Sequence, residues 1–340
     1  MYSIAAAGVA AAIPRVLDAQ GGRAAAGASA VRAFRIDTHS HFSIPKLYKL
    51  ATDRGVQQAT LADWSPDKML KEMDEGAVQT SIISISDPGV HFGDNMAARA
   101  LARECNEYAA KVIADHPGRF GLFAVLPLPD VDGALREAEY ALDTLKADGI
   151  GVLSSYEGKY LGNPVYDPLL VEMNRRKAII YCHPYCAACG AQQTLTDAQN
   201  RGVEFVFDTT RTILSLLQTG QVAKYPDITF IWSHGGGTMP YITSRFGAAK
   251  GPDGKPNETL QTIQKFYYDT AQAYNPYTLE GFTRLIPNSH IFFGSDYLGN
   301  AGSAGNVIRG LDAYTGFTPQ QRQAIYRDNA LKLFPRFARA

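Results

Sequence analysis

The sequence has no excess of charge of either sign. Lys and Arg together number 33, Asp and Glu also number 33, and the formal net charge is zero. Proteins that bind nucleic acid or an anionic membrane surface usually carry a basic patch or a large positive charge. The balance gives no indication of either, so we expect no nucleic-acid partner. At 46% hydrophobic residues, the chain can bury the large core of a globular enzyme.

Cysteine is scarce, with four residues in a chain of 340. This is too few for the disulfide framework that holds small secreted domains together. Cys186 and Cys189 form a C-x-x-C pair, which a redox site or half of a zinc knuckle would use, but there is no second such pair. We interpret these cysteines as small residues in the loop after a strand.

A long apolar run is also missing. The apolar residues 3–14 are too few to span a bilayer. They belong to an Ala- and Gly-rich leader, residues 1–33, which resembles the apolar part of a secretory signal without the basic residues that normally precede it. Either it is a truncated signal, which would place the protein in the periplasm or outside the cell, or it is a disordered leader, which favours the cytoplasm.

From residue 34 onward, short apolar runs alternate with longer segments of helical period. Eight runs are apolar almost throughout, which is typical of parallel strands covered on both faces. They are residues 34–37, 80–86, 120–126, 149–154, 178–183, 228–234, 266–269 and 290–296. Right-handed crossovers repeated eight times close such a sheet into a barrel. We therefore predict one α/β domain, a (β/α)8 TIM barrel, over residues 34–340.

Helices are predicted between these strands. Ser65 before Pro66 and Thr318 before Pro319 are typical helix starts. The other predicted helices are residues 95–115, 130–146, 164–176, 209–223, 241–250, 276–286 and 304–314. A doubly wound open sheet is the alternative fold, but no Gly-x-Gly-x-x-Gly follows the first strand.

One region does not fit the alternation. Residues 184–202 contain no convincing helix, and residues 203–207 have the composition of a strand. Because no crossover helix separates them from the preceding strand, we interpret residues 203–207 as an extra segment leading into the next helix.

Residues that can bind a metal stand at the carboxyl ends of four predicted strands, which is where barrel enzymes carry their chemistry. They are His39 and His41, His183, His234, and Asp296. Residues two apart in a strand point the same way, so His39 and His41 can aim at one point. Singly, each could be an ordinary loop, turn or cap residue. Together they describe imidazoles and a carboxylate around one divalent ion, with a position open for water or substrate.

The motifs around these residues resemble a known family. They are residues 36–42 (IDTHSHF), 182–184 (CHP), 232–237 (WSHGGG) and 293–297 (FGSDY), with further likeness at residues 106–108, 116–120, 174–177 and 207–211. Over residues 34–335 the chain resembles the amidohydrolase superfamily. Within it, the chain is similar to the aminocarboxymuconate-semialdehyde decarboxylase-like branch, and in particular to 6-methylsalicylate decarboxylases.

The resemblance implies His39, His41, His183 and Asp296 as ligands of one divalent metal ion, zinc in the first instance and manganese as the alternative. It implies His234 as an acid/base beside the metal. Either Asp296 or a metal-bound water, assisted by His234, would then donate the proton that replaces carbon dioxide. Related enzymes are commonly homodimers or homotetramers.

Substrate contacts are less well defined. The resemblance implies that Arg245 pairs with a substrate carboxylate, and a structural ion pair is the equal alternative. Phe42, Trp64 and Tyr297 are candidates to wall an aromatic ring, as is Phe92, although ordinary packing accounts for each. Two departures from the family pattern are residues 298–300, where proline is common after the Ser-Asp-Tyr motif, and Gly237, where some decarboxylases have glutamate.

The predicted function is a metal-dependent, non-oxidative decarboxylase of a small hydroxyaryl or muconate-type carboxylic acid, such as 6-methylsalicylate. The alternative is a mononuclear metal-dependent hydrolase of an ester, lactone or amide, because the same ligands can activate water. The fourth strand, residues 149–154, has no lysine to bridge two metals, which favours one metal and the decarboxylase. A non-catalytic scaffold is a third hypothesis, which the intact ligand set disfavours.

Overall fold

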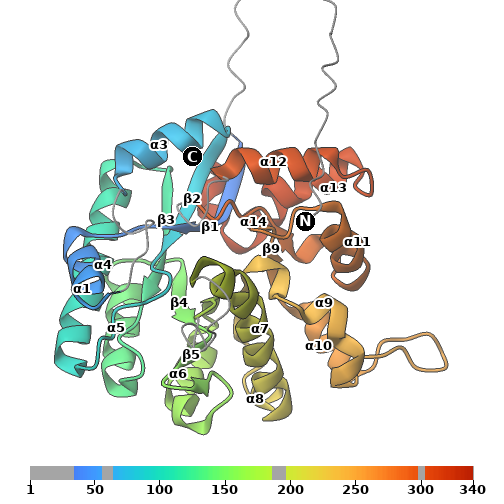
Figure 1. Ribbon diagram of the computed structural model, residues 1–340, viewed down its shortest axis with the longest axis horizontal. Helices are drawn as coiled ribbons and strands as arrows, with labels where there is room; N and C mark the ends of the chain where they lie inside the picture. Colours follow the sequence, from blue (N-terminus) through green and yellow to red (C-terminus); the bar gives the residue numbers. More distant parts are fainter. Residues whose placement is uncertain (1–33, 56–63, 186–196, 298–302, 340) are drawn as a thin grey trace, which may run out of the picture. The chain divides into compact units, whose positions relative to one another are not determined.

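The computed structural model describes residues 34–55, 64–185, 197–297 and 303–339. At its centre is a sheet of eight parallel strands in the order β1-β2-β3-β4-β7-β8-β9-β10 (Figure 1). Their bounds are β1 (Arg35–His41), β2 (Val78–Ser84), β3 (Phe120–Val125), β4 (Gly149–Leu153), β7 (Ile179–His183), β8 (Thr229–Trp232), β9 (Tyr267–Asp269) and β10 (Ile291–Phe292). All eight predicted strands are present.

Backbone hydrogen bonds join the last strand region to the first. The Thr38 N–H donates to the Phe293 carbonyl at 2.9 Å, and the His41 N–H to the Tyr297 carbonyl at 3.2 Å. In return, the Asp296 N–H donates to the His39 carbonyl at 2.9 Å. These bonds close the sheet, so the predicted (β/α)8 barrel is confirmed.

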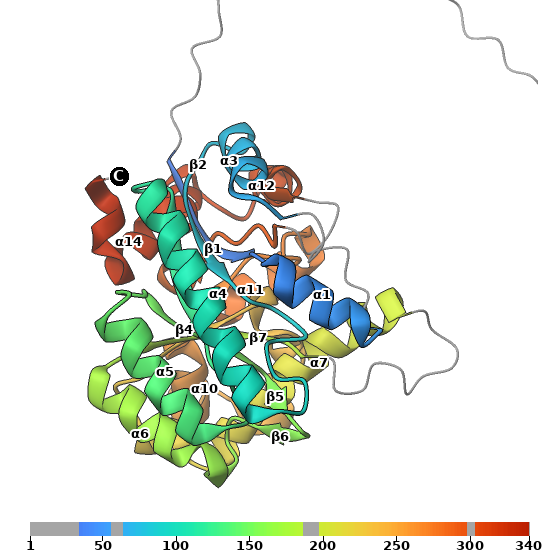
Figure 2. The same cartoon turned by 90° about the vertical axis from the view of Figure 1, so that its left-hand side faces the viewer.

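Helices surround the strands, and α4, α5 and α6 stand side by side on one flank (Figure 2). The helices are α1 (Pro45–Asp53), α3 (Pro66–Glu75), α4 (Asn95–Asp115), α5 (Val131–Asp143), α6 (Asp167–Arg176), α7 (Asp197–Gln218), α8 (Gln221–Lys224), α9 (Met239–Ile242), α10 (Glu258–Lys265), α11 (Pro276–Leu285), α12 (Ser303–Ala313), α13 (Pro319–Gln323) and α14 (Asn329–Leu333). Within the described ranges, none is both long and apolar enough to cross a membrane.

Both predicted helix starts are confirmed by side-chain caps. The Ser65 hydroxyl accepts from the Lys68 N–H at the start of α3. At α13, the side chains of Thr318 and Gln321 each accept from the other's backbone N–H, forming a capping box.

The prediction for residues 184–207 is wrong from Asp197 onward, because this segment is helical. Residues 203–207 are neither a strand nor an extra segment, because α7 runs unbroken from Asp197 to Gln218. The sequence Val-Glu-Phe-Val-Phe suggests a strand, but a helical turn lets Phe205 pack beside the His183 ring and Asp208 reach hydroxyls near β4. Tertiary contacts therefore override the local preference.

The helices differ from the prediction in two further respects. The helix predicted over residues 241–250 is shorter, since α9 passes into a 3-10 helix, Thr243–Phe246, that ends at Gly247. Helices α1 and α10 were not predicted; both are short, with eight or nine residues. The leader, residues 1–33, lies outside the described residues.

The inside of the barrel is filled by apolar side chains from β1, β2, β3, β7, β8 and β10. Ile36, Ile82, Phe123, Tyr181 and Phe292 belong to this cluster, and the Phe123 and Tyr181 rings stack with centroids 4.9 Å apart. In β1 the pairing register with β2 shifts between Asp37 and Ser40. Such an irregularity re-aims side chains, and it accounts for Ile36 and the histidines further along β1 all facing the interior.

We predict that Asn106→Ala destabilises the barrel. Asn106 is fully buried on α4; its amide donates to the Val125 carbonyl and to Glu137, and its oxygen accepts from the Val125 N–H. Removing it leaves buried polar groups unpaired, which should lower the free energy of unfolding by about 2–4 kcal/mol. The measurement is urea unfolding. Asn95→Ala on the same helix removes one exposed bond to His91 and should change stability by less than about 1 kcal/mol.

Candidate metal centre

Five polar side chains meet at the carboxyl end of the barrel. We call them the histidine–aspartate cluster: His39, His41, His183, His234 and Asp296. His39 and His41 lie at the end of β1, His183 ends β7, His234 lies two residues beyond β8, and Asp296 lies beyond β10. All are buried; His234, the most exposed, is 8% exposed.

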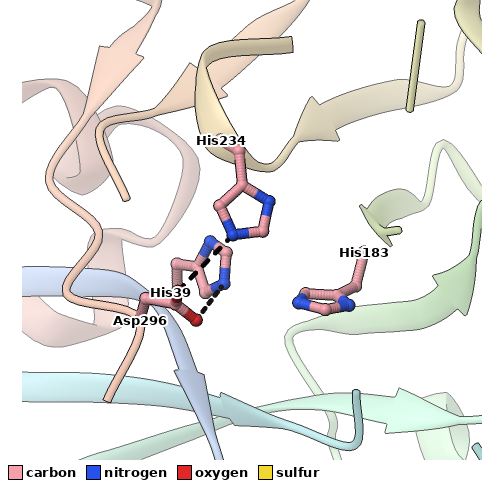
Figure 3. Close-up of side chains that lie close together, drawn as sticks. All are labelled: His39, His183, His234 and Asp296. Carbon is pink, nitrogen blue, oxygen red and sulfur yellow. Dashed lines mark ion pairs between the residues drawn. The ribbon is translucent and has the colours of Figure 1, made fainter. Parts of the chain in front are cut away.

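Distances within the cluster are those of a metal site. One ligand atom from each of His39, His183, His234 and Asp296 lies within 4.8 Å of the others (Figure 3). His41 joins them, since its Nε2 is 3.2 Å from His39 Nε2 and 3.2 Å from Asp296 Oδ1. The structure therefore brings together every residue for which the sequence predicts a ligand or acid/base role.

Three of the histidines have a partner for the ring nitrogen that faces away from the cluster. His39 Nδ1 donates to Asp269 Oδ2 at 2.8 Å, and His183 Nδ1 donates to the Pro184 carbonyl at 2.9 Å. His41 Nδ1 lies 3.3 Å from the Ser84 hydroxyl. These bonds orient the rings and leave each Nε2 free to face the centre, which is the usual support for a metal-ligating histidine.

His234 is held differently. Its backbone N–H donates to Asp269 Oδ1 at 3.0 Å, and its φ is +53°, a conformation that side chains rarely adopt. Nδ1 of this ring is buried and has no hydrogen-bond partner among the described residues. Nε2 lies 3.6 Å from Asp296 Oδ2.

The glycines after His234 bring helix α7 against this loop. Gly237 has a φ of +70°, and a Cβ there would lie 2.1 Å from the Val206 carbonyl oxygen. Glycine is therefore required by both backbone conformation and space. The same contact places Phe205 near the cluster, with its ring centroid 5.8 Å from that of His183.

Two buried aspartates, Asp37 and Asp269, support the cluster, although no sequence motif predicted a role for either. Asp269 ends β9, so its place at the end of a predicted strand was the pattern that could have identified it. Asp37 accepts from the N–H groups of His39 and Ser295, both at 3.0 Å, and from the Ser81 and Ser295 hydroxyls. Burial raises the pKa of Asp37 to about 6, although these hydrogen bonds act in the opposite direction.

The pKa values of the cluster residues shift in different directions. Burial lowers the pKa of His41 and, more strongly, of His183. Burial acts the same way on His39, but Asp269 and Asp296 outweigh it and raise the pKa of His39 to about 10. Although burial opposes it, the rings of His234, His39 and His41 that face Asp296 hold the pKa of its carboxyl well below the usual value.

These residues fit a divalent cation. Neutral His41 and His183 offer nitrogen lone pairs beside an anionic Asp296, and the buried Nδ1 of His234 marks a polar site rather than apolar packing. Imidazole and carboxylate are ligands of zinc and of manganese. The protein therefore carries a buried site of three histidines and one aspartate that can hold a metal ion. β4 has no lysine with which to bridge a second ion.

The aromatic residues predicted to line the substrate pocket are mainly core residues. Phe42 is 2% exposed, with its ring centroid 5.9 Å from that of Trp64, and Trp64 packs in turn against Tyr108. Phe92 is partly buried under the Arg54 guanidinium. Tyr297 is half-buried and directly follows Asp296, just as Phe42 directly follows His41.

Arg245 is exposed in the 3-10 helix Thr243–Phe246. Among the described residues it forms no ion pair, so nothing supports the structural alternative, and its substrate role stays a prediction. Cys186, Cys189 and residues 298–300 lie outside the described part of the chain.

We predict that Asp269→Asn weakens metal binding about 10- to 100-fold, because an amide cannot accept hydrogen bonds on both sides as the carboxylate does. The dissociation constant is measured by competition with a chelator. Asp208→Asn is the matched control: Asp208 is a buried carboxylate bonded to hydroxyls of Ser155 and Tyr160. Equal metal affinity in Asp269→Asn and the wild type would contradict the orienting role.

Comparison with known proteins identifies the family. The Amidohydrolase family model matches residues 36–336. The chain is 34% identical to "Decarboxylase yanB" of Aspergillus niger, over 89% of this chain and 88% of that protein. It is 33% identical to "6-methylsalicylic acid decarboxylase acuB" of Aspergillus aculeatus, over 90% and 97%.

A solved structure agrees with these relatives. The crystal structure of an amidohydrolase II protein superimposes with a TM-score of 0.80 at 27% identity, covering 88% of this chain and 99% of that one. The resemblance seen in the sequence motifs is therefore confirmed over the whole barrel. The chain belongs to the amidohydrolase family, and within it to the branch of metal-dependent, non-oxidative decarboxylases.

Proposed function

We propose that this protein removes carbon dioxide from a small hydroxyaryl carboxylic acid, with 6-methylsalicylate as the first candidate. The observation that carries the proposal is the convergence of four imidazoles and Asp296 at one buried point of the barrel. The substrate class is suggested by the relative from Aspergillus aculeatus, whose name gives 6-methylsalicylic acid. A mononuclear hydrolase would use a similar site, but both relatives described above are named decarboxylases.

The hydrogen bonds of the rings support a division of roles. His39, His41 and His183 each have a partner at Nδ1, which is typical of metal ligands. His234 has none among the described residues. We therefore assign His39, His41, His183 and Asp296 to the metal, and we assign His234 to proton transfer.

A divalent cation held there would bind the carboxylate together with the adjacent hydroxyl of the acid, neutralise the negative charge and fix the ring in place. The carbon–carbon bond to the carboxylate then breaks, carbon dioxide leaves, and the electron pair stays on the ring carbon. A proton must reach that carbon. His234 Nε2 and Asp296 Oδ2 lie 3.6 Å apart, so these two groups can hold the proton and pass it on, and His234 can regain one afterwards.

The burial of the cluster keeps bulk water away from the reacting groups. A dry site strengthens the interaction between the cationic centre and the substrate anion. Phe205, whose ring centroid lies 5.8 Å from that of His183, and Tyr297, which follows Asp296, are candidates to contact the ring of the substrate. Arg245 is proposed to attract the substrate carboxylate from its exposed position.

The identity of the ion and the assembly state complete the proposal. Three or four imidazoles favour zinc, while manganese would be more usual with additional oxygen ligands. Elemental analysis of protein purified without chelator distinguishes the two. We propose a homodimer or homotetramer, which sedimentation analysis tests.

We predict that metal-loaded protein releases carbon dioxide from a panel of ortho-hydroxybenzoates, including 6-methylsalicylate, and that chelation abolishes this release. The assay follows carbon dioxide and the decarboxylated phenol together. Small lactones and esters serve as comparison substrates. Acid release from these without carbon dioxide from any hydroxybenzoate would select the hydrolase.

The two histidine roles predict different losses. His183→Ala should lose bound metal and activity together, because it removes a ligand. His234→Ala should retain metal at wild-type stoichiometry, while kcat falls about 100- to 10,000-fold because proton transfer is lost. Metal content by elemental analysis and kcat are measured on the same samples. Wild-type rates in both variants would show that the assignment is wrong.

A further inference from the structure

Gln272 is a residue near the cluster to which no role has been given so far. It lies three residues beyond the end of β9, between the buried residues Ala271 and Ala273. Its side-chain Nε2 donates to Asp296 Oδ2 at 3.0 Å. An exposed residue thus sends its amide group inward to a buried carboxylate.

The backbone of Gln272 is in an unfavourable conformation. Its φ is +54°, in the left-handed region where glycine and asparagine are preferred. The turn is closed by the Ala273 N–H donating to the Thr270 carbonyl at 3.0 Å. A non-glycine residue is kept in such a conformation only when surrounding contacts enforce it, and such residues gather at functional sites.

The bond gives the two oxygens of Asp296 different surroundings. Oδ1 is 3.2 Å from His39 Nε2 and from His41 Nε2. Oδ2 instead has Gln272 Nε2 at 3.0 Å and His234 Nε2 at 3.6 Å. One oxygen therefore faces the ligand histidines, and the other faces the histidine assigned to proton transfer.

We infer that Gln272 is a positioning residue: its amide fixes the rotation of the Asp296 carboxylate so that Oδ1 faces the metal and Oδ2 faces His234. The terminal torsion of an aspartate is broad and nearly two-fold, so the ligand histidines alone do not hold it at one angle. The glutamine side chain is long enough to reach Oδ2 from this turn. This inference rests on the proposed function, because it gives Oδ2 a part in proton transfer.

The test is Gln272→Gly, which removes the amide and suits the positive φ. We expect kcat to fall about 10- to 100-fold, as for loss of a hydrogen bond to a charged group, and KM to change by less than about 3-fold. Metal stoichiometry should stay at the wild-type value. The melting temperature should stay the same or rise by up to about 3 °C, because backbone strain is relieved.

Two further variants separate the loss of the amide contact from the relief of backbone strain. Gln272→Asn keeps an amide and tolerates the positive φ, but its side chain is too short, so its kcat should fall as in Gln272→Gly. Lys177→Gly is the matched control for strain. Lys177 has a φ of +51° at the exposed end of α6, before β7 begins and hence away from the cluster. It should show the same change in melting temperature with wild-type kcat.

Cobalt-loaded protein gives a readout that does not need turnover. Its visible spectrum depends on ligand geometry, so Gln272→Gly should shift the bands and Lys177→Gly should not. An unchanged spectrum with wild-type kcat would overturn the inference. So would a lower melting temperature accompanied by metal loss, which indicates a structural role, or a raised KM at unchanged kcat, which indicates substrate binding. If the wild type decarboxylates no acid, the proposed function fails and the spectrum alone decides on Gln272.

Discussion

The carboxylate of Asp269 is the contact on which the geometry of the site depends. One oxygen accepts from the ring of His39, and the other accepts from the backbone N–H groups of His234 and Ala271. A single buried side chain on β9 thus orients a histidine of β1, fixes the loop after β8 and shapes the turn that carries Gln272. Gly294 allows this, because a Cβ there would lie 2.8 Å from His39 Cβ and 2.9 Å from Asp269 Cβ. Because Gly294 has no side chain, His39 and Asp269 can approach closely enough for their hydrogen bond to form.

The residues that close the barrel are also residues that form or support the cluster. Asp37 bonds to Ser81 on β2 and to Ser295 beyond β10, so it joins strands on both sides of β1. The backbone bonds that close the sheet run through His39, His41 and Asp296 themselves. A backbone movement at His39, His41 or Asp296 would therefore break hydrogen bonds that close the sheet. This coupling explains why the ligands lie at strand ends rather than on long loops, since strand ends hold side chains more rigidly.

Much of the fold and of the cluster could be predicted, because strands and candidate metal ligands have recognisable local patterns in the sequence. The eight apolar runs, the spacing of His39 and His41, and the histidine that ends β7 are all visible in the sequence. The role of Asp269 depends on two partners far along the chain, and the turn at Gln272 has no glycine to indicate a positive φ. The part of helix α7 before Thr209 was missed because the valines and phenylalanines of residues 203–207 suggest a strand. Which histidine lacks a partner at Nδ1 is a property of three-dimensional packing alone.

The cluster also places a demand on stability. His234, Gln272 and Asp296 have φ values of +53°, +54° and +59°, and all three meet at one carboxylate. Left-handed conformations cost about 1 kcal/mol or more each for residues other than glycine, and four imidazoles are buried within a few ångströms of one another. The hydrogen bonds that Asp269 accepts and the one that Gln272 donates offset part of this cost. A bound ion would favour the folded state through its ligands. The strain and the crowded rings are then features of a site that a bound cation would stabilise, since its binding energy would hold the groups proposed for proton transfer in conformations the chain alone disfavours.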